Sequence, residues 1–322
     1  MSTLFTGISE LRTVSERGTL NDAAIIAQSG TIAWVGPASE APAADEKVDL
    51  GGRAVLPGWV DSHTHMVFDG DRSAEFEARI SGGSYEAGGI AVTMDATRQA
   101  GTDRLDQLVA DRVAAGRRGG TTTFETKTGY GLNTESEVEA AKVASRHVDD
   151  VTFLGAHLVP PGADAEEYLD EVVGPMLEGV APYVQWIDVF CERGAFNEEQ
   201  SRRVLEAGKK LGLGLRVHGN QLGEGLGVAL AVELGAASVD HVNHLTDEDV
   251  ELLANSDTVA TMLPACDLST REPLAPGRTL LDAGATLAIA SNLNPGTSYT
   301  SSMNYCVTTA VLQQHLSVDE AI

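Results

Sequence analysis

From Pro57 onward, the chain alternates short apolar segments with longer amphipathic ones, and this alternation constrains the fold more than any other feature. The short segments have the length and composition of buried strands, and the longer ones place apolar residues at helical spacing. Such a pattern is typical of βα units around a parallel sheet. We count eight apolar segments, at residues 59–65, 121–127, 151–158, 185–191, 214–218, 238–241, 258–263 and 286–291.

Eight βα units predict an α/β fold, a TIM-like (β/α)8 barrel formed by residues 57–322. An open parallel sheet is the alternative that the pattern leaves open. Residues 1–56 differ, because they contain strand-like segments and glycine turns without helical spacing. Segments 24–27 and 31–36 flank a Ser-Gly pair and predict a hairpin. We therefore expect a small N-terminal β lead-in, separate from the barrel.

The connection after the first barrel strand, residues 66–92, is long and rich in glycine. Connections of this length in compact domains are usually functional or disordered. Because this one would lie above the mouth of the barrel, we expect a functional loop.

The chain is strongly acidic, with 47 Asp and Glu against 22 Lys and Arg, a net charge of −25. An anionic surface repels nucleic acid and anionic membranes, so neither is expected as a partner. Two explanations of the charge remain open, a solvated acidic exterior and adaptation to a salt-rich cytoplasm.

The cysteine pattern and the first residues bear on the compartment. Cys191, Cys266 and Cys306 are widely spaced and form no CxxC motif, which argues against a disulfide framework and a thiolate zinc site. The N-terminus lacks a basic stretch followed by an apolar run, and no segment approaches about 18 uninterrupted apolar residues. We expect a cytoplasmic protein.

Five histidines fall at the ends of predicted barrel strands. His63 and His65 end the first strand, where the two-residue period sends both imidazoles to the same side. His157, His218 and His241 end the third, fifth and sixth strands. Active sites of such barrels are assembled at these strand ends, so the five should meet at one mouth.

Each histidine alone could be an ordinary hydrogen-bonded residue, but their joint placement favours a metal site. Imidazole nitrogens completed by carboxylate or water suit zinc or ferrous iron. We therefore predict one divalent metal ion, with His63 and His65 as its first two ligands. Such an ion activates water near neutral pH.

Several sequence runs carry a resemblance to a known family. The run LPGWVDSHTH at 56–65 resembles the amidohydrolase superfamily of metal-dependent hydrolases. The runs FDGDR at 68–72, TKTGYGL at 126–132, GAH at 155–157, VHGNQ at 217–221 and NPGT at 294–297 narrow the resemblance to its imidazolonepropionase family. The resemblance covers the whole chain.

The resemblance implies hydrolysis of 4-imidazolone-5-propanoate, a small carboxylate, to N-formimino-L-glutamate in histidine degradation. A metal-activated water would cut the ring C–N bond, in a protein that forms a homodimer. The resemblance also implies a β-sandwich domain to which the lead-in belongs, with its C-terminal part missing from this chain. We therefore expect a truncated sequence.

The resemblance also assigns roles to residues. Arg72 would bind the propionate through its guanidinium fork, although a surface ion pair is the commoner fate of a loop arginine. Packing of the loop is the alternative for Tyr85. The implied metal ligands are His63, His65, His218 and Asn292, the catalytic residues are His241, Gln221 and Asn292, and the substrate contacts are Arg72, Tyr85, Tyr130, His157, Asn294, Gly296 and Thr297.

One position departs from the pattern, because the resemblance implies Asp where the chain has Asn292. An amide offers a weaker oxygen ligand and cannot accept a proton from water. Either an engineered, inactivated version or a natural variant would explain it. Lys127 occupies a strand end where some relatives carry a carboxylated lysine, but we expect a structural ion pair.

Two other functions remain possible. Another cyclic amidohydrolase or a deaminase would share His63, His65, His218 and His241. A neutral nucleobase, however, has no carboxylate for Arg72 to bind. A non-catalytic ligand-binding homologue would explain Asn292. We expect the metal-dependent hydrolase.

Overall fold

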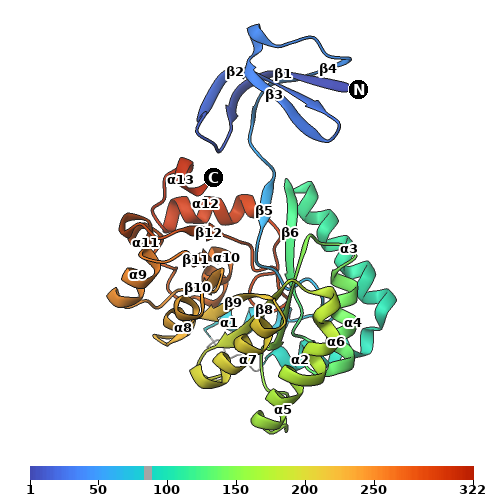
Figure 1. The fold of residues 1–322 in the computed structure, drawn as a ribbon, viewed down its shortest axis with the longest axis vertical. Helices are drawn as coiled ribbons and strands as arrows, with labels where there is room; N and C mark the ends of the chain where they lie inside the picture. The colour runs from blue at the N-terminus through green and yellow to red at the C-terminus, as the bar shows by residue number, and fades with distance from the viewer. Residues whose placement is uncertain (83–88) are drawn as a thin grey trace. The chain divides into compact units, whose positions relative to one another are not determined.

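The computed structural model describes residues 1–82 and 89–322 of the chain. They divide into two compact units, Met1–Gly58 with Ile322, and Trp59–Ala321 (Figure 1). The first unit is a four-stranded sheet and the second is built from parallel strands and helices.

The sheet of the first unit contains β1 (Ser2–Arg12), β2 (Thr19–Gln28), β3 (Thr31–Pro37) and β4 (Glu46–Val55) in the order β3-β2-β1-β4. The predicted hairpin joins β2 and β3, and its two turn residues, Ser29 and Gly30, have φ of 52° and 79°. Positive φ at both positions matches the twist of the flanking strands. Ile8, Leu11 and Ala23 form a small buried core.

The second unit confirms the predicted barrel. In the part of the chain that the structure describes, eight parallel strands pair in chain order around one sheet. They are β5 (Trp59–Asp61), β6 (Thr121–Lys127), β7 (Asp150–Ala156), β8 (Trp186–Cys191), β9 (Gly214–Gly219), β10 (Ser238–His241), β11 (Val259–Met262) and β12 (Leu287–Ile289).

Hydrogen bonds between the two ends of this sheet close the barrel. Thr64 and Leu293 form a parallel bridge, and the His65 amide donates to the Leu293 carbonyl at 2.8 Å. The Asn292 amide donates to the His63 carbonyl at 3.0 Å. The first strand was predicted to reach residue 65, but β5 ends at Asp61. Beyond Asp61 the backbone makes isolated hydrogen bonds to two different strand ends, from the Lys127 amide to Thr64 and from the His65 amide to Leu293, instead of a continuous ladder.

Helices cover the outside of the barrel, with α3 and α4 beside the early strands and α8 and α9 beside the late ones (Figure 1). The glycine-rich connection at 66–92 was predicted as a loop, but the run SAEFEARI forms α1 and a second helix begins at Ile90. The described helices of this unit are α1 (Ser73–Ile80), α2 (Ile90–Ala100), α3 (Thr102–Arg118), α4 (Thr134–Ala144), α5 (Ala165–Glu171) continued by η3 (Val172–Met176), α6 (Leu177–Val180) and η4 (Ala181–Tyr183), α7 (Glu198–Lys210), α8 (Gly227–Leu234), α9 (Asp247–Ala254), α10 (Pro264–Thr270), α11 (Gly277–Ala283), α12 (Met303–Gln313) and α13 (Val318–Ala321).

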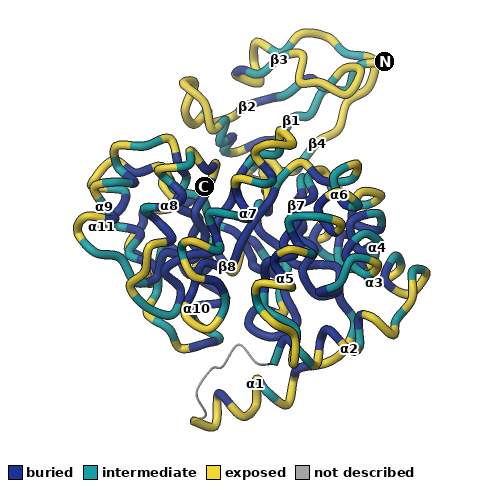
Figure 2. Tube along the Cα trace, turned by 60° about the horizontal axis from the view of Figure 1, so that its bottom comes forward, coloured by how far each residue is buried: buried dark blue, intermediate teal, exposed yellow. Residues whose placement is uncertain are grey.

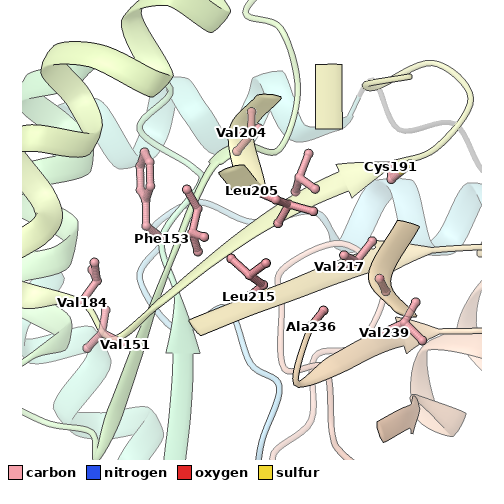
Figure 3. Close-up of a cluster of buried hydrophobic side chains, with 14 of the residues drawn as sticks. Val151, Phe153, Val184, Cys191, Val204, Leu205, Leu215, Val217, Ala236 and Val239 are labelled. Atoms are coloured by element: carbon pink, nitrogen blue, oxygen red, sulfur yellow. The ribbon is translucent and has the colours of Figure 1, made fainter. Parts of the chain in front are cut away.

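The core of the second unit lies between the strands and these helices, where buried backbone contrasts with the exposed outer surface (Figure 2). Phe153 of β7, Leu215 and Val217 of β9, and Val239 of β10 belong to this core together with Leu205 of α7 (Figure 3). Burying each such side chain contributes roughly 1.5–3 kcal/mol. Among the described residues, no helix is both long and apolar enough to cross a membrane.

Candidate active site

The carboxyl ends of the barrel strands surround a small pocket of about 30 Å³. It adjoins a wider cavity of about 830 Å³, because Arg72 and Thr297 line both. Most residues predicted for the site meet in the small pocket. Its lining consists of His65, Arg72, Ile90, Tyr130, His157, Phe190, His218, Gln221, His241, Asn292, Asn294 and Thr297.

Three predicted residues lie elsewhere. His63 is fully buried directly against the pocket, with its ring centroid 4.6 Å from that of His218. Gly296 lines the wider cavity. Tyr85 lies outside the residues that the structure describes.

Four imidazoles gather at one point of the pocket. The Nε2 atoms of His63 and His65 are 3.3 Å apart. Ligand atoms of His63, His218 and His241 all lie within 4.8 Å of one another. Residues that come from three different strand ends, those of β5, β9 and β10, therefore present nitrogen atoms to one small volume.

Two carboxylates orient two of these imidazoles. The Nδ1 atom of His63 lies 2.7 Å from an Asp240 oxygen, and Nδ1 of His218 lies 3.0 Å from an Asp188 oxygen. A carboxylate only accepts hydrogen bonds, so each Nδ1 carries a proton and Nε2 is the nitrogen left to bind a ligand. Such partners fix the tautomer and the ring orientation of histidine ligands.

Lys127 lies beneath this layer as the predicted structural ion pair, which the structure confirms. Its ammonium is 3.0 Å from Glu125 and 3.0 Å from Asp188, and 3.7 Å from Asp240. All four side chains are buried. The histidines therefore rest on a buried cluster of one ammonium and three carboxylates.

Other polar atoms of the site find no hydrogen-bond partner among the described residues. They are Nδ1 of His65, Nε2 of His218, Nδ1 of His241 and Oδ1 of Asn292. Leaving a buried polar group unsatisfied costs about 1–3 kcal/mol, so four together call for a missing ligand. The backbone is strained at the same place, since φ is 86° at His241 and 51° at Asn292.

Burial determines the charge of the imidazoles. It lowers the pKa of His63, His65 and His241 well below the ordinary histidine value, aided by nearby positive charge from Lys127 or neighbouring imidazoles. Burial also lowers the pKa of His157 to about 4. Neutral imidazole is the form that binds metal ions.

The donor set therefore fits a divalent metal ion of borderline softness. His63, His65 and His218 offer imidazole nitrogens, and Asn292 offers an amide oxygen that no described residue uses. The geometry adds His241 to the candidate ligands, beside its predicted role in proton transfer.

Arg72, predicted as a carboxylate clamp, is buried and engaged by α1. Its Nε and Nη2 both donate to Glu75 at 2.8 Å, and Arg79 donates to the same carboxylate at 3.0 Å. A Cβ on Gly296 would approach the Arg72 guanidinium to 2.3 Å. Glycine at this position therefore leaves room for the arginine.

The NPGT run forms a tight loop around Asn294. The Asn294 Oδ1 accepts from the amides of Gly296 and Thr297, at 2.9 and 2.7 Å, and its Nδ2 donates to the Asn292 carbonyl at 2.7 Å. Asn294 thus uses its side chain to shape the loop.

Tyr130 and His157 face each other across the pocket, with ring centroids 5.4 Å apart. The Nδ1 of His157 bonds the Gly129 carbonyl at 2.8 Å, which leaves Nε2 for a ligand. Gln221 lines the same pocket, and its backbone amide donates to Glu192 at 2.8 Å.

Sequence reasoning missed the partners of the histidines. Asp188 is a charged residue inside the apolar run IDVF, and Asp240 directly precedes the strand-end His241, and these were the available signals. Glu75, Arg79 and Cys266 also adjoin the site without having been predicted.

Comparisons with known proteins identify the fold and the family. No family model matches the chain. Among solved structures, an adenosine deaminase from Xanthomonas campestris with bound zinc has a TM-score of 0.68 at 18% identity, covering 99% of this chain and 75% of its own. A guanine deaminase from C. acetobutylicum gives 0.68 at 14% identity, over 100% of this chain and 84% of its own. At such low identity these likenesses establish the fold alone.

Curated relatives go further. An imidazolonepropionase from Arthrobacter sp. (strain FB24) is 65% identical over 100% of this chain and 83% of its own length. One from Streptomyces griseus is 51% identical over 100% of this chain and 83% of its own. The chain belongs to the imidazolonepropionase family.

Proposed function

We propose that this chain hydrolyses 4-imidazolone-5-propanoate to N-formimino-L-glutamate, a step of histidine degradation. The observation that carries the proposal is the cluster of neutral imidazoles, with the Nε2 atoms of His63 and His65 3.3 Å apart beside Arg72 in one pocket. In the reaction, water adds its oxygen to the ring carbonyl carbon. The ring C–N bond breaks, and the leaving nitrogen takes a proton.

The proposed cofactor is one divalent ion, zinc or iron, held by His63, His65 and His218 with Asn292 or His241. When bound, it supplies the positive charge that activates water and stabilises the developing oxyanion. A structural neighbour carries zinc, and the imidazole donors accept either metal.

The remaining lining residues recognise the substrate. Arg72 pairs with the propionate. Its two hydrogen bonds to Glu75 show how this guanidinium engages a carboxylate. His157 presents the Nε2 lone pair to the substrate ring, where it accepts a hydrogen bond from a ring N–H, since its own Nδ1–H donates to the Gly129 carbonyl. Tyr130 packs against the ring, and the Gln221 amide hydrogen-bonds a ring nitrogen.

The site offers few groups that could transfer a proton. His241 is the nearest candidate to carry a proton, because its Nδ1 has no hydrogen-bond partner among the described residues. Asn292 cannot serve as a base. This observation favours a second candidate function, a protein that binds the substrate and turns it over slowly or not at all.

A turnover assay on the imidazolone substrate, with metal content measured on the same sample, separates the two. Rapid turnover by metal-loaded protein supports the hydrolase. Calorimetric binding of an imidazolone-propionate analogue without turnover supports the binding protein. Metal-loaded protein that neither binds nor hydrolyses the substrate overturns both.

Three further expectations belong to this proposal. We infer a homodimer, by resemblance to the family, and a cytoplasmic location for a catabolic enzyme. The net charge of −25 speaks against binding to nucleic acid or anionic membranes. Sedimentation of the purified protein tests the dimer.

A further inference from the structure

We propose that Lys127 is a positioning residue for the metal site, acting through Asp188 and Asp240 on His218 and His63. The inference rests on the proposed function, because it presumes a divalent ion at the imidazoles. It assigns to a buried lysine the task of holding two ligands from different strands in one geometry.

The contacts form two chains that start at the same ammonium. Lys127 Nζ lies 3.0 Å from Asp188, whose other oxygen lies 3.0 Å from His218 Nδ1. The ammonium also lies 3.7 Å from the Asp240 oxygen that is 2.7 Å from His63 Nδ1. One charge therefore contacts both carboxylates that orient ligands.

The barrel architecture explains how one side chain reaches both. Lys127, Asp188 and Asp240 lie on β6, β8 and β10, which are alternate strands of the sheet. Alternate strands of a (β/α)8 barrel contribute side chains to the same interior layer. The three residues thus form one layer, directly beneath the histidines at the strand ends.

Hydrogen-bond polarity then determines which nitrogen faces the ion. A carboxylate only accepts hydrogen bonds, so Asp240 and Asp188 accept from the Nδ1–H of His63 and His218, while the ammonium pairs with their charge. Each imidazole consequently carries an N–H on Nδ1, so the nitrogen left to bind an ion is Nε2. Without the ammonium, two carboxylates would lie buried with one fewer cation to hold their oxygens in place.

His65 provides the contrast within the same site. Its Nδ1 has no hydrogen-bond partner among the described residues. The protein thus fixes two imidazoles through Lys127 and leaves the third to be oriented by the ion itself. Partners of metal ligands typically contribute about 10- to 100-fold to metal affinity.

The test compares Lys127→Met with Glu125→Gln, a matched control. Glu125 contacts the same ammonium at 3.0 Å and is equally buried, but it hydrogen-bonds Thr64 and Thr152 rather than a histidine. Zinc affinity is measured by chelator competition, and the visible spectrum is recorded after loading with cobalt(II). Thermal melting of the metal-free protein measures how much each change destabilises the fold.

We expect Lys127→Met to lose about 10- to 100-fold in zinc affinity and to shift the cobalt spectrum, while Glu125→Gln stays within about threefold of the original affinity. If Lys127→Met does not fold, Asp188→Asn and Asp240→Asn carry the test, with the same losses expected of each. Unchanged affinity and spectrum in the folded variants would overturn the inference alone. Failure of the unaltered chain to bind any divalent ion would overturn the proposed function and this inference with it.

Discussion

The candidate pocket has two sides that differ in how far the protein has fixed their polar atoms. On the oriented side, His63 and His218 each bond a carboxylate that also contacts Lys127. On the unpartnered side, His241 and Asn292 each keep a buried polar atom without a hydrogen-bond partner among the described residues. Both sides are buried to a similar degree.

The difference separates the side chains proposed to hold an ion in place from those proposed to take part in its chemistry. The oriented side is preorganised, so ligand binding there requires little rearrangement. The unpartnered side is completed only by a ligand, and its chemistry depends on which residue occupies position 292. The amide of Asn292 supplies an oxygen but no carboxylate base.

The largest effect on the contrast between the two sides is expected from Asn292→Asp. A carboxylate at this position accepts a proton from water and adds a charged ligand, so turnover should rise by about 100-fold or more. Steady-state rates on metal-loaded protein measure the change. Asn292→Ala is the control, because it removes the amide without adding a base, and it should gain nothing. Equal rates for the Asp variant and the unaltered chain would show that position 292 does not limit the chemistry.

Replacing Arg72 by Met tests whether substrate binding depends on a residue that belongs to neither side of the pocket. Loss of a charged hydrogen-bonding partner should raise KM about 10- to 100-fold and leave kcat within a few-fold. Arg104→Met removes an exposed arginine that pairs with Asp69, and it serves as the control. A fall in kcat with unchanged KM would instead place Arg72 among the groups that act on the reacting atoms.

The oriented side can be compared directly with His65. We expect His218→Ala to weaken zinc binding about tenfold more than His65→Ala, because only His218 has its Nδ1 held by a carboxylate. Chelator competition measures both affinities. His315→Ala, at an exposed histidine outside the site, controls for general effects of histidine removal. Equal losses would mean that orientation by Asp188 contributes little.

The smallest effect is expected at a surface ion pair, which gives a baseline for the buried ones. Hydrogen bonds from Arg278 lower the pKa of Glu320 from 4.5 to about 2. A lowered pKa contributes stability above the ordinary value, and this contribution is lost as the pH falls through about 2. The melting temperatures of Glu320→Gln and the unaltered chain should therefore converge slightly as the pH falls from about 5 to about 2.5. A constant difference across that range would mean that the pair contributes nothing measurable.

The sequence predicted the barrel because its strands are apolar runs with regular spacing, and the histidines follow from where those runs end. It failed at α1, since the flanking glycines outweighed the helical composition of SAEFEARI in the prediction. It also missed Asp188 and Asp240 as partners of the histidines. Contacts between side chains on different strands depend on which residues share an interior layer, and that layer follows from the register of the closed barrel.

The bridge between Thr64 and Leu293 has a consequence for folding during synthesis. It brings Asn292 against the backbone of His63, so the two halves of the pocket meet only when the barrel closes. A nascent chain that has emerged only as far as β11 carries all four clustered histidines but not the segment that completes their surroundings. An ion at this site would therefore meet its complete surroundings only after the last strand has joined the barrel.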